Sequence, residues 1–155
     1  PDEIEEDALD TQKYVVAQIQ ECYSRAVRYY QIDTEAVIDE LFDTIESSPA
    51  TSSNPADYID AHSLEYRELT YYGQYSLNYI FHKFMEGEQN GLRGQLMRIL
   101  LDDLAPEAKL RLYAETGQEY FDEWAKGAVQ VLEQHDMDWI KENQPAMWIY
   151  LQMVE

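Results

Sequence analysis

Apolar side chains recur along this sequence at the spacing of an α-helix, and this periodicity most constrains how the chain can fold. They follow one another at intervals of four and three residues between positions 15 and 29, and a second stripe runs between 37 and 45. Such spacing lines one face of a helix with about 3.6 residues per turn. Alternating apolar and polar runs, which mark strands, do not exceed about four residues. We therefore predict an all-α bundle of six to eight helices. The stripes consist of Val15, Ile19, Cys22, Ala26 and Tyr29, and of Val37, Ile38, Leu41, Phe42 and Ile45.

Capping residues and prolines divide the chain into these helices. Asp33 is expected to cap the helix that carries the second stripe. The segment Ser47–Pro55 is rich in Ser, Thr and Pro and has no periodicity, which predicts a loop, and Asn54 with Pro55 is typical of a helix start. Further helices are predicted to start near Thr116, Asp136 or Asp138, and Pro145, with a short one marked by Leu110 and Tyr113.

Residues 63–88 carry apolar and aromatic groups on nearly all sides of a helical projection. We expect a Tyr-rich central helix contacted by several neighbours, with Gly73 in its interior. A glycine there costs about 1 kcal/mol relative to alanine, which a close helix crossing would explain. The tyrosines are expected to pack around this helix or to line a pocket or a dimer seam; they are Tyr71, Tyr72, Tyr75 and Tyr79.

The length of 155 residues predicts a single helical domain, 1–155, frayed at its acidic start 1–7. The single cysteine, Cys22, indicates a reducing compartment, so the cytoplasm is the expected location. No apolar run approaches the roughly 18–20 residues of a membrane helix. The chain starts at Pro1 without Met, so we expect that a preceding segment of a longer protein is missing.

The net charge of −20 is the extreme value of this composition, with 31 Asp and Glu against 11 Lys and Arg. Nucleic acids and anionic membranes carry the same sign, so we predict that the chain binds neither directly. A basic protein, for instance one that binds nucleic acid, is the expected partner. Residues 1–50 are the most acidic, with 13 acids and three bases.

Carboxylates on the first two predicted helices recur every 5–6 Å or so, comparable to the phosphates of a nucleic-acid strand. A rigid helical body with such a row presents a DNA-like field to a basic partner. The alternative is a solvated acidic face of a salt-adapted protein. The predicted partner-binding residues are Asp10, Glu21, Glu35, Asp39, Glu40, Asp43 and Glu46.

Metal and catalytic signatures are weak in this chain. A di-iron bundle needs Glu three residues before His, but the residues three before the histidines at 62, 82 and 135 are Ile, Tyr and Leu. His62, Glu65 and Glu68 share a helix face and could hold one ion, but a capped, solvated first turn is the favoured interpretation. There is no nucleophile motif and no phosphate-binding loop. We predict no cofactor, no metal and no catalytic residue.

The sequence thus favours a non-enzymatic interaction protein that binds and occludes a basic surface of a partner, in the manner of nucleic-acid-mimic inhibitors or immunity and antitoxin proteins. Trp148 and Tyr150 are expected to be exposed and to contact another chain, and a homodimer is compatible with the sequence. The first alternative is a helical ligand-binding or regulatory domain with an aromatic pocket, which is compatible with its being part of a longer chain. The second is a metal-dependent helical enzyme.

Overall fold

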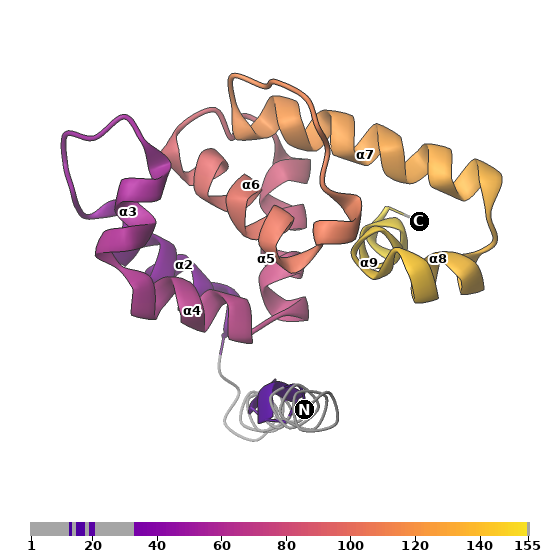
Figure 1. Cartoon of the computed structure of the whole chain (residues 1–155), viewed down its shortest axis with the longest axis horizontal. Helices are drawn as coiled ribbons and strands as arrows, with labels where there is room; N and C mark the ends of the chain where they lie inside the picture. Colours follow the sequence, from indigo (N-terminus) through magenta and orange to yellow (C-terminus); the bar gives the residue numbers. More distant parts are fainter. Residues whose placement is uncertain (1–12, 14, 18, 21–32, 155) are drawn as a thin grey trace, which may run out of the picture.

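The computed structural model describes residues 13, 15–17, 19, 20 and 33–154, and most of them are helical (Figure 1). These residues include no strand, so the all-α prediction is confirmed. Eight α-helices lie between residues 33 and 154, and the described residues before position 33 are helical as well, so the helices outnumber the predicted six to eight. They are α2 (Thr34–Glu46), α3 (Pro55–Ala61), α4 (Ser63–Tyr71), α5 (Gln74–Glu86), α6 (Leu92–Leu104), α7 (Gly117–Gln134), α8 (Met137–Asn143) and α9 (Pro145–Met153), with a 3₁₀ turn, η1 (Pro106–Ala108), after α6.

Four of the eight α-helices between residues 33 and 154 start at a capping side chain, as predicted. The side chain of Asp33 accepts a hydrogen bond from the backbone N–H of Ala36 at 3.2 Å. Asn54 caps α3 in the same way, with Pro55 as the first helical residue. Thr116 Oγ1 accepts from the N–H of Glu119 at 3.1 Å, and Asp136 accepts from that of Trp139 at 2.8 Å. These contacts satisfy backbone donors that a helix leaves unpaired at its start.

The predicted central helix, 63–88, is wrong as a continuous element. Gly73 adopts a positive φ of +50°, which ends α4 and lets the chain turn before α5. A left-handed conformation suits glycine, so this residue marks a break between two helices. A Cβ there would also lie 2.5 Å from the side-chain amide nitrogen of Gln20. The buried hydroxyl of Ser76 donates to the Leu69 carbonyl at 2.6 Å and ties the two helices together. In Figure 1, α5 and α6 lie between α2–α4 at one end and α7–α9 at the other.

The short helix predicted around Leu110 and Tyr113 is also wrong. Residues 109–116 have no regular secondary structure, and Tyr113 is 87% exposed. The backbone N–H of Leu110 donates to the hydroxyl of Tyr120 at 2.9 Å, so a side chain of α7 holds the segment in place of helical hydrogen bonds.

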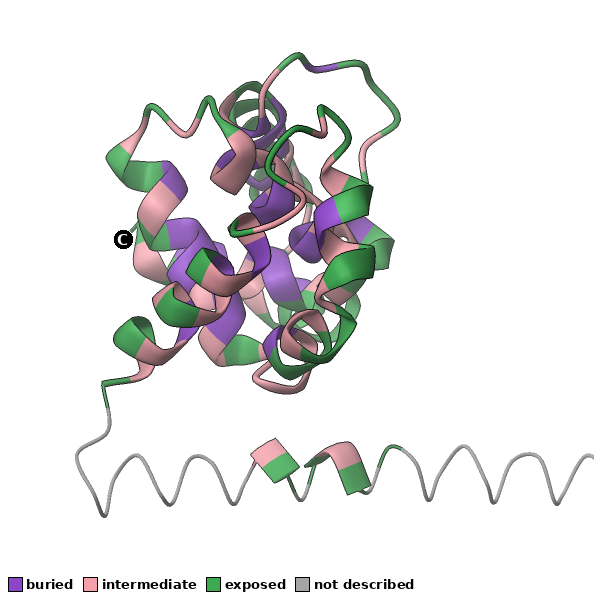
Figure 2. Ribbon diagram, turned by 90° about the vertical axis from the view of Figure 1, so that its left-hand side faces the viewer, coloured by how far each residue is buried: buried purple, intermediate pink, exposed green. Residues whose placement is uncertain are grey.

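Buried side chains from α2 through α9 form one contiguous hydrophobic core, drawn as the purple inner faces of the helices in Figure 2. Aromatic rings make up its α5–α7–α9 part: Phe84 stacks on Phe121 with centroids 4.7 Å apart, and Phe81 lies 5.3 Å from Trp124. Gly117 at the start of α7 touches the backbone of Gly94 in α6, because a Cβ on Gly117 would lie 2.1 Å from the Gly94 carbonyl oxygen. Only glycine allows this approach.

The first predicted stripe is described only in part. Val15 and Ile19 are 49% and 39% exposed, so at these two positions it is not buried as expected. Its remaining members, Cys22, Ala26 and Tyr29, and the acidic start 1–7 lie outside the described residues. None of the described helices is both long and apolar enough to span a bilayer.

Candidate functional site

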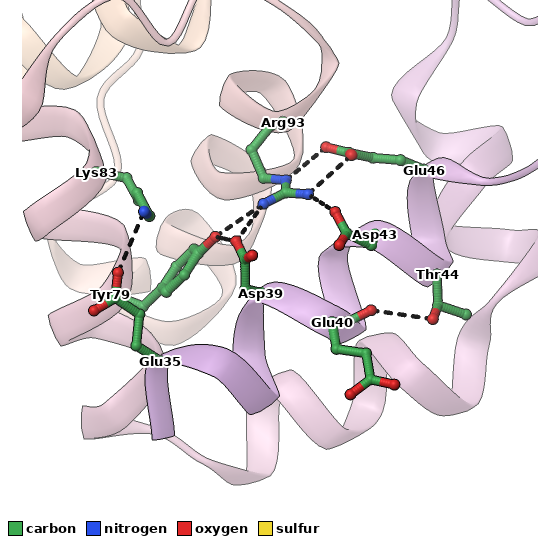
Figure 3. Close-up of polar contacts among 9 residues, drawn as sticks. All are labelled: Glu35, Asp39, Glu40, Asp43, Thr44, Glu46, Tyr79, Lys83 and Arg93. Carbon is green, nitrogen blue, oxygen red and sulfur yellow. Dashed lines mark hydrogen bonds and ion pairs between the residues drawn. The ribbon is translucent and has the colours of Figure 1, made fainter. Parts of the chain in front are cut away.

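Four of the predicted acidic residues lie on one side of α2 and face α5 and α6: Glu35, Asp39, Asp43 and Glu46 (Figure 3). Arg93, from the first turn of α6, points its guanidinium at three of them. It donates to Asp39 at 2.9 Å, to Asp43 at 2.5 Å, and through two nitrogens to Glu46 at 2.6 and 3.0 Å. The planar five-donor fork of arginine suits such simultaneous bonding.

Tyr79 of α5 completes this cluster. Its hydroxyl donates to Asp39 at 2.5 Å and accepts from Arg93 at 2.9 Å. The bond from Tyr79, followed by those from Arg93, lowers the pKa of Asp39 below its ordinary value. Burial alone would lower the pKa of Arg93, but the bonds to Glu46 and Asp43 outweigh it and raise that pKa. Asp39 therefore carries its negative charge and Arg93 its positive charge at neutral pH.

Lys83 of α5 pairs with the fourth carboxylate, that of Glu35, at 3.2 Å. Two cations thus offset half the charge of the four paired carboxylates. Glu40 is exposed and has no ion pair with another described residue, and the side chains of Asp10 and Glu21 lie outside the described residues. The structure brings four of the seven predicted residues together, but around the protein's own cations. No sequence signal pointed to Arg93, since its partners lie 47 to 54 residues away.

A second feature is an open groove of about 940 Å³ between α5, α7 and α9, which we call the α7 groove. Phe84, Phe121 and Tyr150 supply its aromatic floor. α7 contributes two rows of side chains with a spacing of four residues. The first row is apolar (Phe121, Ala125 and Val129), and the second is polar (Gln118, Asp122, Lys126 and Gln130).

Hydrogen bonds fix the end of the groove where α5 meets α7. The Gln118 amide donates to the Phe84 carbonyl and to Asp122, both at 3.0 Å, and its oxygen accepts from the N–H of Gln89 at 3.1 Å. Glu88 follows the end of α5 with a positive φ of 62°, which places a carboxylate on the groove wall. Non-glycine residues adopt this conformation only at an energetic cost.

Tyr150 was expected to be exposed, and that expectation is wrong. It is 9% exposed, because α9 packs against α7 and its ring meets Phe81, Phe121 and Trp124 edge-on at 5.6 to 5.8 Å. Burial, and then the nearby charge of Asp122, raise the pKa of its hydroxyl.

The other predicted interface aromatic, Trp148, is half-buried. The Lys141 ammonium lies 4.9 Å from its ring centroid. The prediction of exposed aromatics failed because the periodicity of the short apolar helix α9 did not indicate which face packs on α7.

The metal hypothesis finds no support in the described part of the chain, where no three potential ligands gather. His62 Nε2 lies 2.9 Å from the Ser48 hydroxyl, so this ring is engaged with the loop before α3. Glu65 lies in the first turn of α4, which begins directly after His62.

Comparisons with known proteins supply no relative from which function could be transferred. The chain matches no protein-family model, no curated protein and no solved structure.

Proposed function

We propose that this protein is a non-enzymatic interaction protein that binds and occludes a basic surface of a protein partner. The supporting observation is that acidic residues outnumber basic ones and that most of the basic side chains are engaged within the protein. Residues 33–154 contain 23 Asp and Glu but eight Lys and Arg. Five of these eight cations make intramolecular contacts with carboxylates or aromatic rings: Lys83, Arg93, Arg98, Lys126 and Lys141. The external field is therefore set by carboxylates, which attract a basic protein and repel nucleic acid.

Inhibitors that mimic nucleic acid and immunity or antitoxin proteins act in this way. The four paired carboxylates of α2, which we call the α2 row, belong to Glu35, Asp39, Asp43 and Glu46. They support nucleic-acid mimicry less than their spacing alone would, because Arg93 and Lys83 offset part of their charge. The same contacts hold the carboxylates in fixed positions, and a fixed array loses less conformational entropy when a partner binds. We place this activity in the cytoplasm, as the lone cysteine suggests.

The test is direct binding at increasing NaCl concentration, with purified basic proteins, acidic proteins of similar size and duplex DNA as probes. We expect association with basic proteins alone, weakening by at least about tenfold between roughly 50 and 300 mM salt. If no basic protein binds at the lower salt concentration, or if binding is insensitive to salt, the proposal is refuted.

The α7 groove favours a second candidate function, a ligand-binding domain. Its volume of about 940 Å³ and aromatic floor are typical of sites for small apolar molecules. This version predicts that an aromatic or fatty ligand raises the melting temperature of the protein in proportion to the logarithm of its concentration. Unlike the pocket foreseen from sequence, the groove is open and has one tyrosine among its lining residues, Tyr150.

A further inference from the structure

We propose that the α7 groove is the site at which the partner docks, and that the docked segment is an amphipathic helix with Lys and Arg beside its apolar stripe. This inference rests on the proposed function and deepens it by naming the surface and the chemistry of the bound segment. It moves the main contact from the carboxylates of α2, which are paired within the protein, to the groove between α5, α7 and α9.

The dimensions of the groove match a helix. Its lining residues on α7 run from Gln118 to Gln130, which corresponds to about 18 Å at the rise of an α-helix. A bound helix of about 12 residues would cover that length and insert apolar side chains at positions i, i+3, i+4 and i+7.

A second hollow, of about 530 Å³, adjoins the groove and shares Asp122 and Lys126 with it. The highly exposed Tyr113 stands at its wall. Together the two hollows exceed the roughly 300–1,000 Å³ of a small-molecule site, which favours a protein occupant.

The apolar side chains of the groove are open to a partner. Val129 and Met85 are 46% and 44% exposed, and they flank a floor in which Phe121 is nearly fully buried. An apolar stripe of a docked helix would remove both from water. Among the described residues the hydroxyl of Tyr150 has no hydrogen-bond partner, so it can bond a polar group of the occupant.

The charge of the groove selects a basic occupant. Glu88 and Asp122 line it, and Glu119 and Glu123 line the adjoining hollow. Lys126 is the one base among these described lining residues, and it pairs with Glu123 at 3.0 Å. Lysines or arginines flanking the apolar stripe of a bound helix would meet the remaining carboxylates.

The test uses two synthetic peptides of equal length and charge, one with leucines at helical spacing among lysines and the other with the same residues scrambled. Their affinities are measured for the wild-type chain and for Val129→Lys. Leu64→Lys is the matched control, because Leu64 is a 70% exposed residue of α4 outside the groove and its replacement adds the same charge. We expect the amphipathic peptide to bind about tenfold more tightly than the scrambled one, and Val129→Lys alone to abolish this preference.

The outcomes separate this inference from the function on which it rests. If both peptides bind in a salt-dependent way but equally, or if the two variants weaken binding equally, the groove assignment is wrong while charge-driven binding stands. If neither peptide binds at low salt, the proposed function itself fails.

A second pair of variants tests the two carboxylates that line the α7 groove, those of Glu88 and Asp122. Glu88→Gln with Asp122→Asn should weaken binding of the amphipathic peptide severalfold and reduce its salt dependence. Asp138→Asn with Glu142→Gln removes the same charge from exposed positions on α8 and should change affinity less than about twofold. If the two double variants changed the affinity for the amphipathic peptide equally, Glu88 and Asp122 would not form part of its binding site.

Discussion

At the scale of single residues, Arg93 shows how one side chain can determine the character of an acidic surface. It joins α6 to α2 through Asp39, Asp43 and Glu46 and contacts Tyr79 of α5. Its side chain is 22% exposed, whereas those of Asp39 and Asp43 are about half or more exposed, so water screens part of these interactions. The cluster therefore links α2, α5 and α6 and also orients the carboxylates of α2.

Replacing Arg93 by methionine should lower the free energy of unfolding by about 2 kcal/mol, because three carboxylates then lose their shared cation and repel one another. Arg93→Lys should recover less than half of this loss, since an ammonium cannot bond three carboxylates through a planar fork. Urea denaturation measures both effects. Arg111→Met, at an exposed position, is the control and should stay within about 0.5 kcal/mol of wild type. If Arg111→Met lowered the free energy of unfolding equally, the contacts of Arg93 would contribute nothing specific to stability.

Replacing either of two glycines of α7 by alanine is predicted to change the stability of the protein, but in opposite directions. Gly117→Ala should destabilise the protein by about 3 kcal/mol, because its Cβ would lie 2.1 Å from the backbone oxygen of Gly94. Gly127→Ala should stabilise it by about 0.5–1 kcal/mol, since its Cβ would meet the Met147 methyl at an ordinary 3.8 Å and alanine favours the helix. Thermal unfolding of both variants tests this contrast, which would be lost if both changes had the same sign.

At the scale of helices, hydroxyl–carboxylate bonds from tyrosine fasten neighbouring elements. Tyr79 of α5 bonds Asp39 of α2, and Tyr120 of α7 bonds Asp102 of α6 at 2.5 Å. Tyr66 of α4 donates likewise to Asp103 of α6. A phenol combines an apolar body with a polar end, so it can fill a core and still tie two helices at its edge. The abundance of tyrosine in this chain therefore has a structural explanation in at least three places.

These bonds predict a loss of stability at alkaline pH. Burial, together with the bond to Asp102, raises the pKa of Tyr120 from 10.0 to about 12. Below pH 10 a tyrosine is protonated in both states. As the pH rises from 10 to 12, the unfolded chain loses this proton while folded Tyr120 keeps it, so stability falls by about 1.4 kcal/mol per pH unit at most for this residue.

Denaturation curves between pH 8 and 12 (roughly the range in which tyrosine titrates) measure this effect. Tyr120→Phe should be less stable at neutral pH but should lose less stability on going to high pH than the wild type does. An unchanged pH dependence in this variant would mean that Tyr120 ionises equally in the folded and the unfolded chain.

At the scale of the whole molecule, the carboxylates of α2 and those of the α7 groove have different surroundings. Lys83 of α5 and Arg93 of α6 pair with carboxylates of α2, whereas the α7 groove keeps carboxylates beside exposed apolar groups. A protein with this arrangement can attract a basic partner at long range and bind it at short range through apolar contact. The salt series and the peptide comparison described above test these two contributions separately.

By itself, the sequence determined the local structure of this protein. Helical periodicity and capping residues such as Asp33, Asn54 and Thr116 predicted the fold class and several helix starts, because these signals act within one or two turns of a helix. The break at Gly73 was missed because a glycine inside an apolar run does not reveal its φ. Only the tertiary structure decided that Arg93 pairs with three carboxylates of α2 and that α5, α7 and α9 leave a groove. Both depend on contacts between residues far apart in the sequence, and local spacing carries no record of which distant side chains meet.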